Sequence, residues 1–456
     1  MGKLWQKGYE LNELIEKFTI GEDWKLDQQL LAADCVASIA HARMLSHIGL
    51  LEKKELRAVE TELRSLISEV REGSFTVSPS DEDGHTAIEN RLVQSLGETG
   101  KKIHTGRSRN DQVIAALRVY GRAAVLRLVE AGAEAAVAFL QMARKNADVP
   151  MPGRTHMQIA MPSSVGLWAA AFAEELIDDL SFLLTTADHL DQSPLGSAAS
   201  YGVPLPLDRQ MVSDALGFRC LHNNVLYVNN SRGKFEAILL DAAEQIMLTL
   251  SKAAQDLIIW SMPEFAYFTL PVELCSGSSI MPQKRNPDML ELVRGKAATV
   301  SAWSQQIKQV VRALPSCYNR DFQETKEPFL RGLSATCDSL RVMRLTIESL
   351  VVNREVLEKA MPREIYATDA AIRLVEEGMS FREAYREIGT HPERVPLLDA
   401  GEALKRRTSE GTPGNLGLER AESSLTALLS RFSALRARHE TAMKELAGGP
   451  VEIAAL

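Results

Sequence analysis

The chain has 456 residues; 45% are hydrophobic and only 6% aromatic, a balance that favours a large core of packed helices over a β-sandwich. Its formal net charge of -8 argues against a nucleic-acid-binding surface, which needs clustered Lys and Arg. The five widely spaced cysteines and the lack of a signal core or a long apolar segment predict a cytoplasmic protein with no disulfide framework, no zinc site and no membrane contact.

The first part of the chain, residues 1–107, is predicted to be an N-terminal domain of short helices. A loop rich in Ser, Pro and Asp runs from Gly73 to Gly84 and interrupts them. His85 follows this loop directly, and Glu89 lies one helical turn further on.

Residues 108–353 are predicted to form a central domain of long helices. Apolar residues recur at steps of one, three or four along 235–257, 289–314 and 330–350, and helices rich in Ala and Leu are expected at about 109–146 and 162–190. A helix of about 28 residues is ~42 Å long, so such helices must lie side by side. The predicted fold is all-α around this bundle. A second apolar face on the first long helix suits either subunit packing or packing within the chain.

The last part, residues 354–456, is predicted to be a small helical domain. It is more charged than the bundle, and helix-breaking residues lie between Gly401 and Gly417.

The loop Gly277–Pro287, with the sequence GSSIMPQKRNP, has the composition of an anion-binding site. Gly277 allows close approach of the backbone to a ligand, and two serine hydroxyls follow it. Lys284 and Arg285 supply positive charge. Asn286 and Pro287 are predicted as the N-cap and first residue of a helix, whose free N–H groups favour negative charge.

This loop resembles the signature loop of the fumarase/aspartase superfamily, whose members eliminate fumarate from succinyl-containing substrates. Three further segments resemble the argininosuccinate lyase family within it, and the resemblance extends from about Phe18 to about Ile388. They are His104–Gln112 (HTGRSRNDQ), Pro152–Gln158 (PGRTHMQ) and Tyr318–Glu327 (YNRDFQETKE). The resemblance implies three mostly helical domains in a homotetramer with a twenty-helix core and shared active sites.

The implied reaction is the reversible anti β-elimination of argininosuccinate to arginine and fumarate, the last step of arginine biosynthesis, without a metal or an organic cofactor. Two alternatives were weighed. Adenylosuccinate lyase is disfavoured by the HTGRSRNDQ and YNRDFQETKE segments. A non-catalytic structural protein on the same fold, as in lens crystallins, is disfavoured by the presence of Ser278, His156, Lys284, Asn286 and Lys326.

The resemblance places the catalytic base at Ser278, with Ser279 as its competitor. An alkoxide there needs surrounding N–H groups and positive charge. His156 is the candidate acid or acid-orienting group, since an imidazole suits proton delivery to the guanidinium leaving group. Arg154 and Met161 stand where the family has Tyr and Gln.

The remaining candidate residues are expected to bind substrate. For the succinyl half they are Arg107, Ser108, Arg109 and Asn110, which precede the first long helix, where N–H groups and guanidinium groups hold carboxylates, together with Asn286. His85 matches a family position near the same site, Thr155 accompanies His156, and Lys284 supplies charge to the serine loop. Tyr318, Gln323 and Lys326 match residues that hold the amino-acid end. Asp23 is either a ligand for cations at that end or a surface carboxylate.

Ser193–Gly202 resembles the flexible loop that closes over the active site in the family. Its glycines and small residues fit a hinge. A tight connection between two helices is the alternative interpretation.

Overall fold

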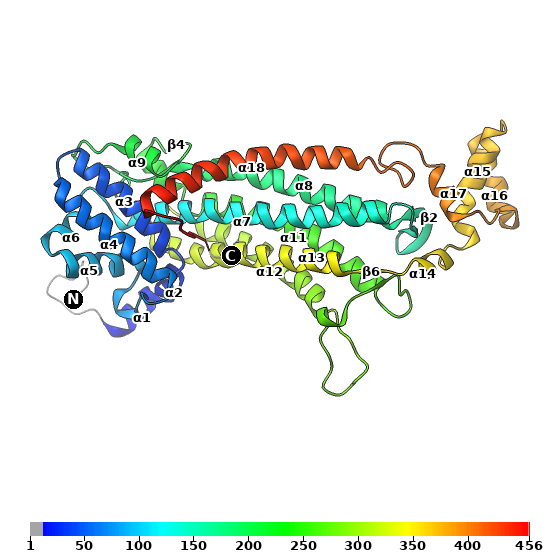
Figure 1. The fold of residues 1–456 in the computed structure, drawn as a ribbon, viewed down its shortest axis with the longest axis horizontal. Helices are drawn as coiled ribbons and strands as arrows, with labels where there is room; N and C mark the ends of the chain where they lie inside the picture. The colour runs from blue at the N-terminus through cyan, green and yellow to red at the C-terminus, as the bar shows by residue number, and fades with distance from the viewer. Residues whose placement is uncertain (1–11, 455) are drawn as a thin grey trace.

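The structure, a computed structural model, describes residues 12–454 and 456. The molecule is elongated, with the long helices parallel to its long axis (Figure 1). The N-terminal helices gather at one end of the bundle, and the small helices α15, α16 and α17 lie at the other. The predicted all-α class is confirmed.

The N-terminal part consists of short helices around one buried helix, α3. The elements are α1 (Glu13–Ile20), α2 (Asp23–Asp27), α3 (Leu31–His47), α4 (Lys53–Arg71), η1 (Pro79–Asp81), α5 (Gly84–Leu96) and α6 (Glu98–Lys102). Asp83 begins α5 as its N-cap, because its side chain accepts a hydrogen bond from Thr86 N at 2.7 Å. This cap places His85 in the first turn, facing the bundle.

The bundle is formed by the five long helices that the apolar periodicity predicts. They are α7 (Arg109–Lys145), α8 (Val165–Leu190), α11 (Lys234–Trp260), α12 (Asp288–Val311) and α13 (Lys326–Ser349). The helices α7 and α8 approach closely where α7 carries Gly132, because a Cβ there would lie 2.5 Å from Leu180 Cδ2. Small residues on these helices therefore set how tightly the bundle packs.

Short elements connect the long helices. They are β3 (Gln192–Ser193), α9 (Arg209–Ala215), β4 (Cys220–Leu221), α10 (Val225–Asn230), β5 (Phe268–Thr269), η2 (Val272–Leu274), η3 (Arg320–Thr325) and β6 (Val351–Val352). Strand β3 pairs in parallel with β4, and β5 pairs antiparallel with β6. The second pairing ties the end of α13 to the segment that follows α11.

A β-hairpin at the end of α7 was not among the predicted elements. Its strands β1 (Pro150–Thr155) and β2 (Gln158–Ser164) pair antiparallel, with Thr155 opposite Gln158. His156 and Met157 form the two-residue turn and have φ of 52° and 62°. Such turns usually carry Asn-Gly or Asp-Gly, and the strands contain three prolines, so neither the turn nor the strands have their usual sequence signal.

The C-terminal part divides between two places. The small elements α14 (Arg354–Lys359), η4 (Arg363–Tyr366), α15 (Ala367–Glu376), α16 (Phe381–Thr390), η5 (Pro392–Arg394) and α17 (Ala400–Lys405) include a separate apolar cluster around Ile365, Tyr366 and Ala384. Helix α18 (Leu418–Ala447) instead contacts α8 and α7 along the bundle. The three-domain division by residue number stays a prediction, and α18 joins the main core of the first two ranges.

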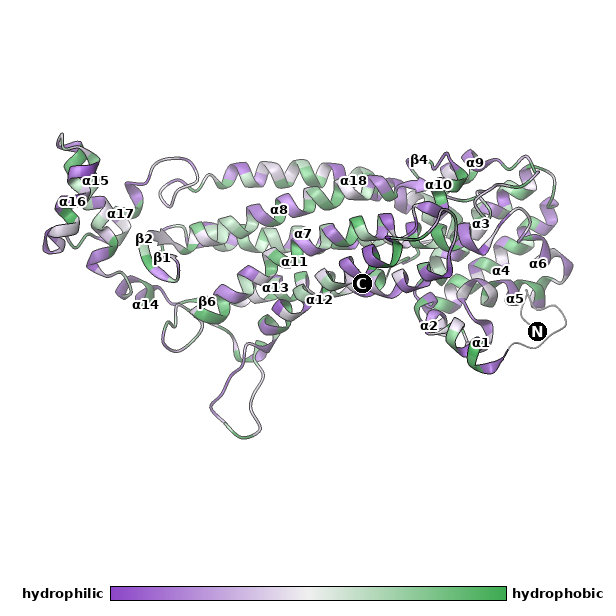
Figure 2. Cartoon of the chain, turned by 180° about the vertical axis from the view of Figure 1, so that it is seen from behind, coloured by the Kyte–Doolittle hydropathy of each residue, from purple (hydrophilic) through white to green (hydrophobic). Residues whose placement is uncertain are grey.

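Hydrophobic positions recur along the whole length of the bundle helices (Figure 2). No helix in the described part of the chain is both long and apolar enough to cross a membrane. Several large apolar side chains on the bundle are nevertheless exposed in the single chain: Phe182 (α8), Leu248 (α11), Leu292 (α12) and Leu345 (α13).

Candidate active site

A polar cavity of about 570 Å³ lies where the N-terminal helices meet the bundle. It is bordered by α2, α5, the first turn of α7, and the segment that leads into α13. Seven of the residues predicted to bind substrate line it: His85, Ser108, Arg109, Asn110, Tyr318, Gln323 and Lys326. Segments more than 200 residues apart in the sequence therefore meet at one site.

Residues at the start of α7 line this cavity. Ser108 is the N-cap of α7, its side chain accepting from Asn110 N at 3.3 Å, and its own N–H donates to Asp111 at 2.9 Å. Arg109 Nη1 lies 3.3 Å from Asp83 Oδ2. Arg107 does not line the cavity; it is buried behind it, where Nη1 donates to Ser38 Oγ at 2.8 Å.

The residues predicted for the amino-acid half line the cavity from η3, the segment before it and the start of α13. Lys326 is only 1% exposed, and its ammonium lies 2.5 Å from Asp27 Oδ1 and 2.8 Å from Asp23 Oδ1. Burial alone would lower the pKa of Lys326, but the two carboxylates outweigh it and raise that pKa. Together, Lys326, Asp23 and Asp27 carry one net negative charge when both aspartates are ionised. Lys326 therefore does not present an isolated positive charge to a ligand.

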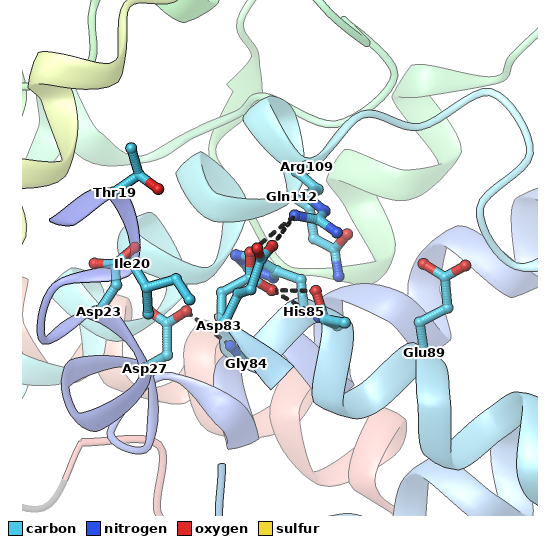
Figure 3. Close-up of polar contacts among 12 residues, drawn as sticks. Thr19, Ile20, Asp23, Asp27, Asp83, Gly84, His85, Glu89, Arg109 and Gln112 are labelled. Atoms are coloured by element: carbon cyan, nitrogen blue, oxygen red, sulfur yellow. Dashed lines mark hydrogen bonds and ion pairs between the residues drawn. The ribbon is translucent and has the colours of Figure 1, made fainter. Parts of the chain in front are cut away.

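Two histidines, His85 and His104, line the same cavity but have pKa values shifted in opposite directions. Nδ1 of His85 lies 2.5 Å from a carboxylate oxygen of Asp34. Nδ1 of His104 lies 3.5 Å from Glu89 Oε2. Burial, with Arg107 and Arg109 nearby, lowers the pKa of His104 to about 4. Figure 3 shows His85 close to Asp83 and Gly84, with Glu89 one turn further along α5.

The predicted serine loop lies elsewhere, on a segment that protrudes from the side of the bundle between η2 and α12 (Figure 1). Its neck is closed by two backbone hydrogen bonds between Ser276 and Asn286. Ser278 Oγ accepts from Ile280 N at 3.4 Å and Met281 N at 3.2 Å. Two backbone N–H groups thus already point at the hydroxyl oxygen that would become an alkoxide. Lys284 is exposed on the same loop.

The prediction that Asn286 caps the following helix is wrong. Helix α12 begins at Asp288, and Asn286 Nδ2 instead donates to Gly277 O at 3.4 Å. The backbone of Asn286 pairs with that of Ser276, and this pairing holds Asn286 in an extended conformation. The helix therefore begins only after Pro287. The side chain of Asn286 braces the serine loop.

Thr155 and His156 are both exposed at the tip of the hairpin. The hairpin follows α7, whose 37 residues span ~55 Å at 1.5 Å per residue, whereas Ser108 lies at the other end of this helix. The single chain therefore brings together the predicted binding residues of the cavity but separates them from the hairpin pair and from the serine loop.

Comparison with known proteins places the chain in a family. Residues 10–302 match a family model described as Lyase. The chain is 45% identical to the argininosuccinate lyase of Sorangium cellulosum, covering 91% of this chain and 97% of that protein. The chain belongs to the argininosuccinate lyase family. A second family member, the argininosuccinate lyase of Thermotoga neapolitana, is 42% identical, covering 85% of this chain and 97% of that protein.

Solved structures support the fold. An EDDS lyase in complex with formate has a TM-score of 0.77 at 24% identity, covering 97% of this chain and 94% of its own. A class II fumarase from Schistosoma mansoni has a TM-score of 0.69 at 16% identity, covering 85% of this chain and 94% of its own. The argininosuccinate lyase resemblance carried by three short segments is confirmed by these relatives, and the chain is a lyase.

In this lyase the segment Ser193–Gly202 is tied to the start of α7. Asp111 Oδ2 accepts hydrogen bonds from Gly196 N at 3.0 Å and Ala198 N at 2.9 Å. Ala198 and Ser200 have φ of 51° and 79°, and such positive values are unfavourable for residues other than Gly. The segment is therefore held in a strained shape beside the cavity, and its role as a hinge stays a prediction.

Several cavity residues were not among the sequence candidates: Asp27, Glu82, Asp83, Arg232 and Arg320. Arg232 had a signal in the polar run Asn229–Arg232 between apolar segments, whereas Asp27 sits in a short helix with no motif. Among the described residues, no three His, Cys, Asp or Glu side chains are grouped so that they could hold a metal ion.

Proposed function

We propose that this protein cleaves argininosuccinate to arginine and fumarate by reversible anti β-elimination, as the last step of arginine biosynthesis, with no metal and no organic cofactor. The observation that carries the proposal is the cavity that brings together two chemically distinct groups of residues. Arg109, Ser108 and Asn110 offer a guanidinium and hydrogen-bond donors to a dicarboxylate. Tyr318, Gln323 and the cluster of Lys326 with two aspartates offer mixed charge to an amino acid.

Ser278 is the proposed base that removes the Cβ proton of the succinyl group. Its oxygen accepts two backbone N–H groups, and Lys284 follows on the same loop. Such donors stabilise an alkoxide and the doubly negative carboxylate that forms after proton removal. His156, with Thr155 beside it, is the proposed group that delivers or orients the proton for the departing guanidinium nitrogen.

The succinyl carboxylates are proposed to bind at the α7 end of the cavity, with Asn286 and Lys284 approaching from the serine loop. Arg107 is buried outside the cavity and held by Ser38, so it stabilises these carboxylates through its charge rather than by direct contact. The amino-acid end binds between Tyr318, Gln323 and Lys326, where Asp23 supplies a carboxylate for the α-ammonium group. Substrates without an amino-acid end would leave this polar region unpaired.

A homotetramer with shared active sites is proposed, because the cavity, His156 and Ser278 lie apart in the single chain. The exposed Phe182, Leu248, Leu292 and Leu345 on the bundle support burial of these helices against other copies. The cytoplasm is the proposed location, which agrees with five free cysteines.

The function is tested by mixing the protein with argininosuccinate and following fumarate absorbance in the ultraviolet. Release of fumarate and arginine in equal amounts is expected. Release of fumarate only from adenylosuccinate would favour the rival lyase, and no release from either substrate would favour a structural protein on this fold.

A further inference from the structure

Asp34 is a buried carboxylate with three side-chain hydrogen-bond partners, one of which lines the cavity. It lies on α3, is 1% exposed, and does not line the cavity itself. Gln112 Nε2 on α7 donates to its two oxygens at 2.9 and 3.0 Å, and Ser38 Oγ donates at 3.3 Å. The third partner is His85 on α5, at 2.5 Å. One charge on α3 is thus joined to α5 and α7, two helices that border the site.

His85 is the partner that reaches the cavity. Its ring is 5% exposed, and its Nε2 has no hydrogen-bond partner although it is buried. A buried polar atom without a partner is unfavourable unless a ligand supplies one. Because Asp34 accepts at Nδ1, the ring orientation is set and Nε2 is the atom available to a ligand.

The charged groups around His85 come from each neighbouring element. Asp27 of α2, Asp34 of α3 and Asp83 at the start of α5 are negative, whereas Arg107, Arg109 and Lys326 are the positive groups of the same region. Burial alone would lower the pKa of His85, but Asp34, helped by Asp83 and Asp27, outweighs it and raises that pKa above 6.5. His104, which has no buried carboxylate at hydrogen-bond distance, is shifted the other way.

We propose that Asp34 is a positioning residue: its carboxylate keeps His85 oriented and protonated so that Nε2–H donates a hydrogen bond to a substrate carboxylate in the cavity. The proposal rests on the proposed function and adds a residue to it. When the Cβ proton is removed, the neighbouring substrate carboxylate becomes more negative. A fixed cation beside this carboxylate stabilises the added charge and so lowers the barrier of the reaction. Through Ser38, which also accepts from Arg107 Nη1, the same carboxylate steadies a second cation.

The first test measures the charge of His85 in the intact protein. Histidine labelled with ¹³C at Cε1 is followed by NMR against pH, and the His85 signal is assigned by its loss in His85→Asn. We expect an imidazolium at pH 7.5 in the wild type, a signal that moves when fumarate is added, and a neutral ring at pH 7.5 in Asp34→Asn. A neutral His85 in the wild type at pH 7.5 overturns the proposal, even if Asp34→Asn does not fold.

The second test separates positioning from a merely structural role. Asp34→Asn should lower kcat for argininosuccinate by at least ~10-fold and move the alkaline loss of activity to lower pH. In a His85→Asn background the loss should be much smaller than in the wild type, because the contact with His85 is already gone and only the contact to Arg107 through Ser38 remains. Independent, additive losses overturn the proposal.

Asp179→Asn is the matched control. Asp179 is a partly buried aspartate on α8 that accepts from Thr249 Oγ1 at 2.7 Å and does not line the cavity, and its replacement should leave kcat and the pH profile unchanged. If the wild type releases no fumarate from argininosuccinate, the proposed function fails, whereas the NMR measurement still decides whether Asp34 keeps His85 charged.

Discussion

Ser278 differs from its neighbour Ser279 in its hydrogen bonds to the loop backbone. Ser278 Oγ accepts two N–H groups of its own loop, a contact that stabilises negative charge on that oxygen. We expect Ser278→Ala to lower kcat by at least ~10³-fold, since removal of one charge-stabilising group at a reaction centre has this scale. The unfolding free energy should change by less than ~1 kcal/mol, because the loop lies outside the core.

Steady-state fumarate release and urea unfolding measure the two quantities. Ser279→Ala is the matched control and should keep kcat within tenfold of wild type. The opposite ranking of the two variants would assign the base to Ser279.

Lys326 has a structural role beside its proposed role in binding. Its ammonium lies between two carboxylates, and both Lys326 and Asp27 are 1% exposed. Lys326→Met leaves these carboxylates unpaired, so we expect a loss of ~3–5 kcal/mol in unfolding free energy together with a higher KM. Urea unfolding at neutral pH measures the loss.

Lys308→Met is the comparison, because Lys308 pairs with Asp241 at the partly exposed surface of the bundle. Exposed ion pairs contribute ~0–1 kcal/mol. Equal losses in the two variants would show that the buried cluster around Lys326 is not a stabilising ion pair.

At the residue scale, the sequence identified cavity residues that stand in recognisable segments, such as Arg109 and Tyr318. It did not find Asp27 or Asp34. Their importance comes from which side chains meet them from other helices, and a lone aspartate in an Ala-rich helix gives no sign of its partners. It also gave no sign of the carboxylates that pair with Lys326, since these partners are 299 residues or more away along the chain.

At the scale of elements, the period of apolar residues predicted all five bundle helices, because long amphipathic helices carry the strongest local signal. The hairpin β1–β2 was missed because its turn is His156-Met157 and its strands contain prolines. The pairing between its two strands, rather than the local β-propensity of their residues, stabilises this hairpin. The helix start at Asp288 was misplaced because Asn286 pairs with Ser276 instead of capping α12.

Helices α7 and α18 are joined by a contact that requires a neutral histidine. Arg122 Nε donates to His439 Nδ1 at 2.9 Å, and burial next to Arg122 lowers the pKa of His439 to about 3. Between about pH 6.5 and 3 the unfolded chain binds a proton that the folded chain does not. His439 therefore lowers the unfolding free energy as pH falls, by about 2 kcal/mol at pH 5.

We expect His439→Asn to flatten the dependence of unfolding free energy on pH between 7.5 and 5, measured by urea unfolding at several pH values. His41 and His222, each with a pKa lowered to about 3, should keep part of the slope. His189→Asn, on an exposed position of α8, is the control and should leave the slope as in wild type. An unchanged slope in His439→Asn would refute the neutral contact.

At the scale of the whole molecule, the separation of the cavity, His156 and Ser278 predicts complementation between inactive variants. His156→Asn and Ser278→Ala are unfolded together and refolded at an equal ratio. A site that takes each residue from a different chain is intact with a chance of about one half times one half, so ~25% of wild-type activity should return.

Mass spectrometry must show hybrid tetramers in the refolded mixture. If such hybrids form and remain inactive, His156 and Ser278 act from the same chain and the shared-site proposal fails, while the proposed reaction stands. Each variant refolded alone is the baseline and should show no activity.

The ~55 Å length of α7 has a consequence for how activity depends on dilution. If the residues at the two ends of this rigid helix belong to different active sites, a newly made chain has no activity until it assembles with other copies. Specific activity should then fall steeply below the dissociation constant of the assembly. Argininosuccinate would touch several chains at once, so by mass action it should hold the assembly together at dilutions where the free protein comes apart.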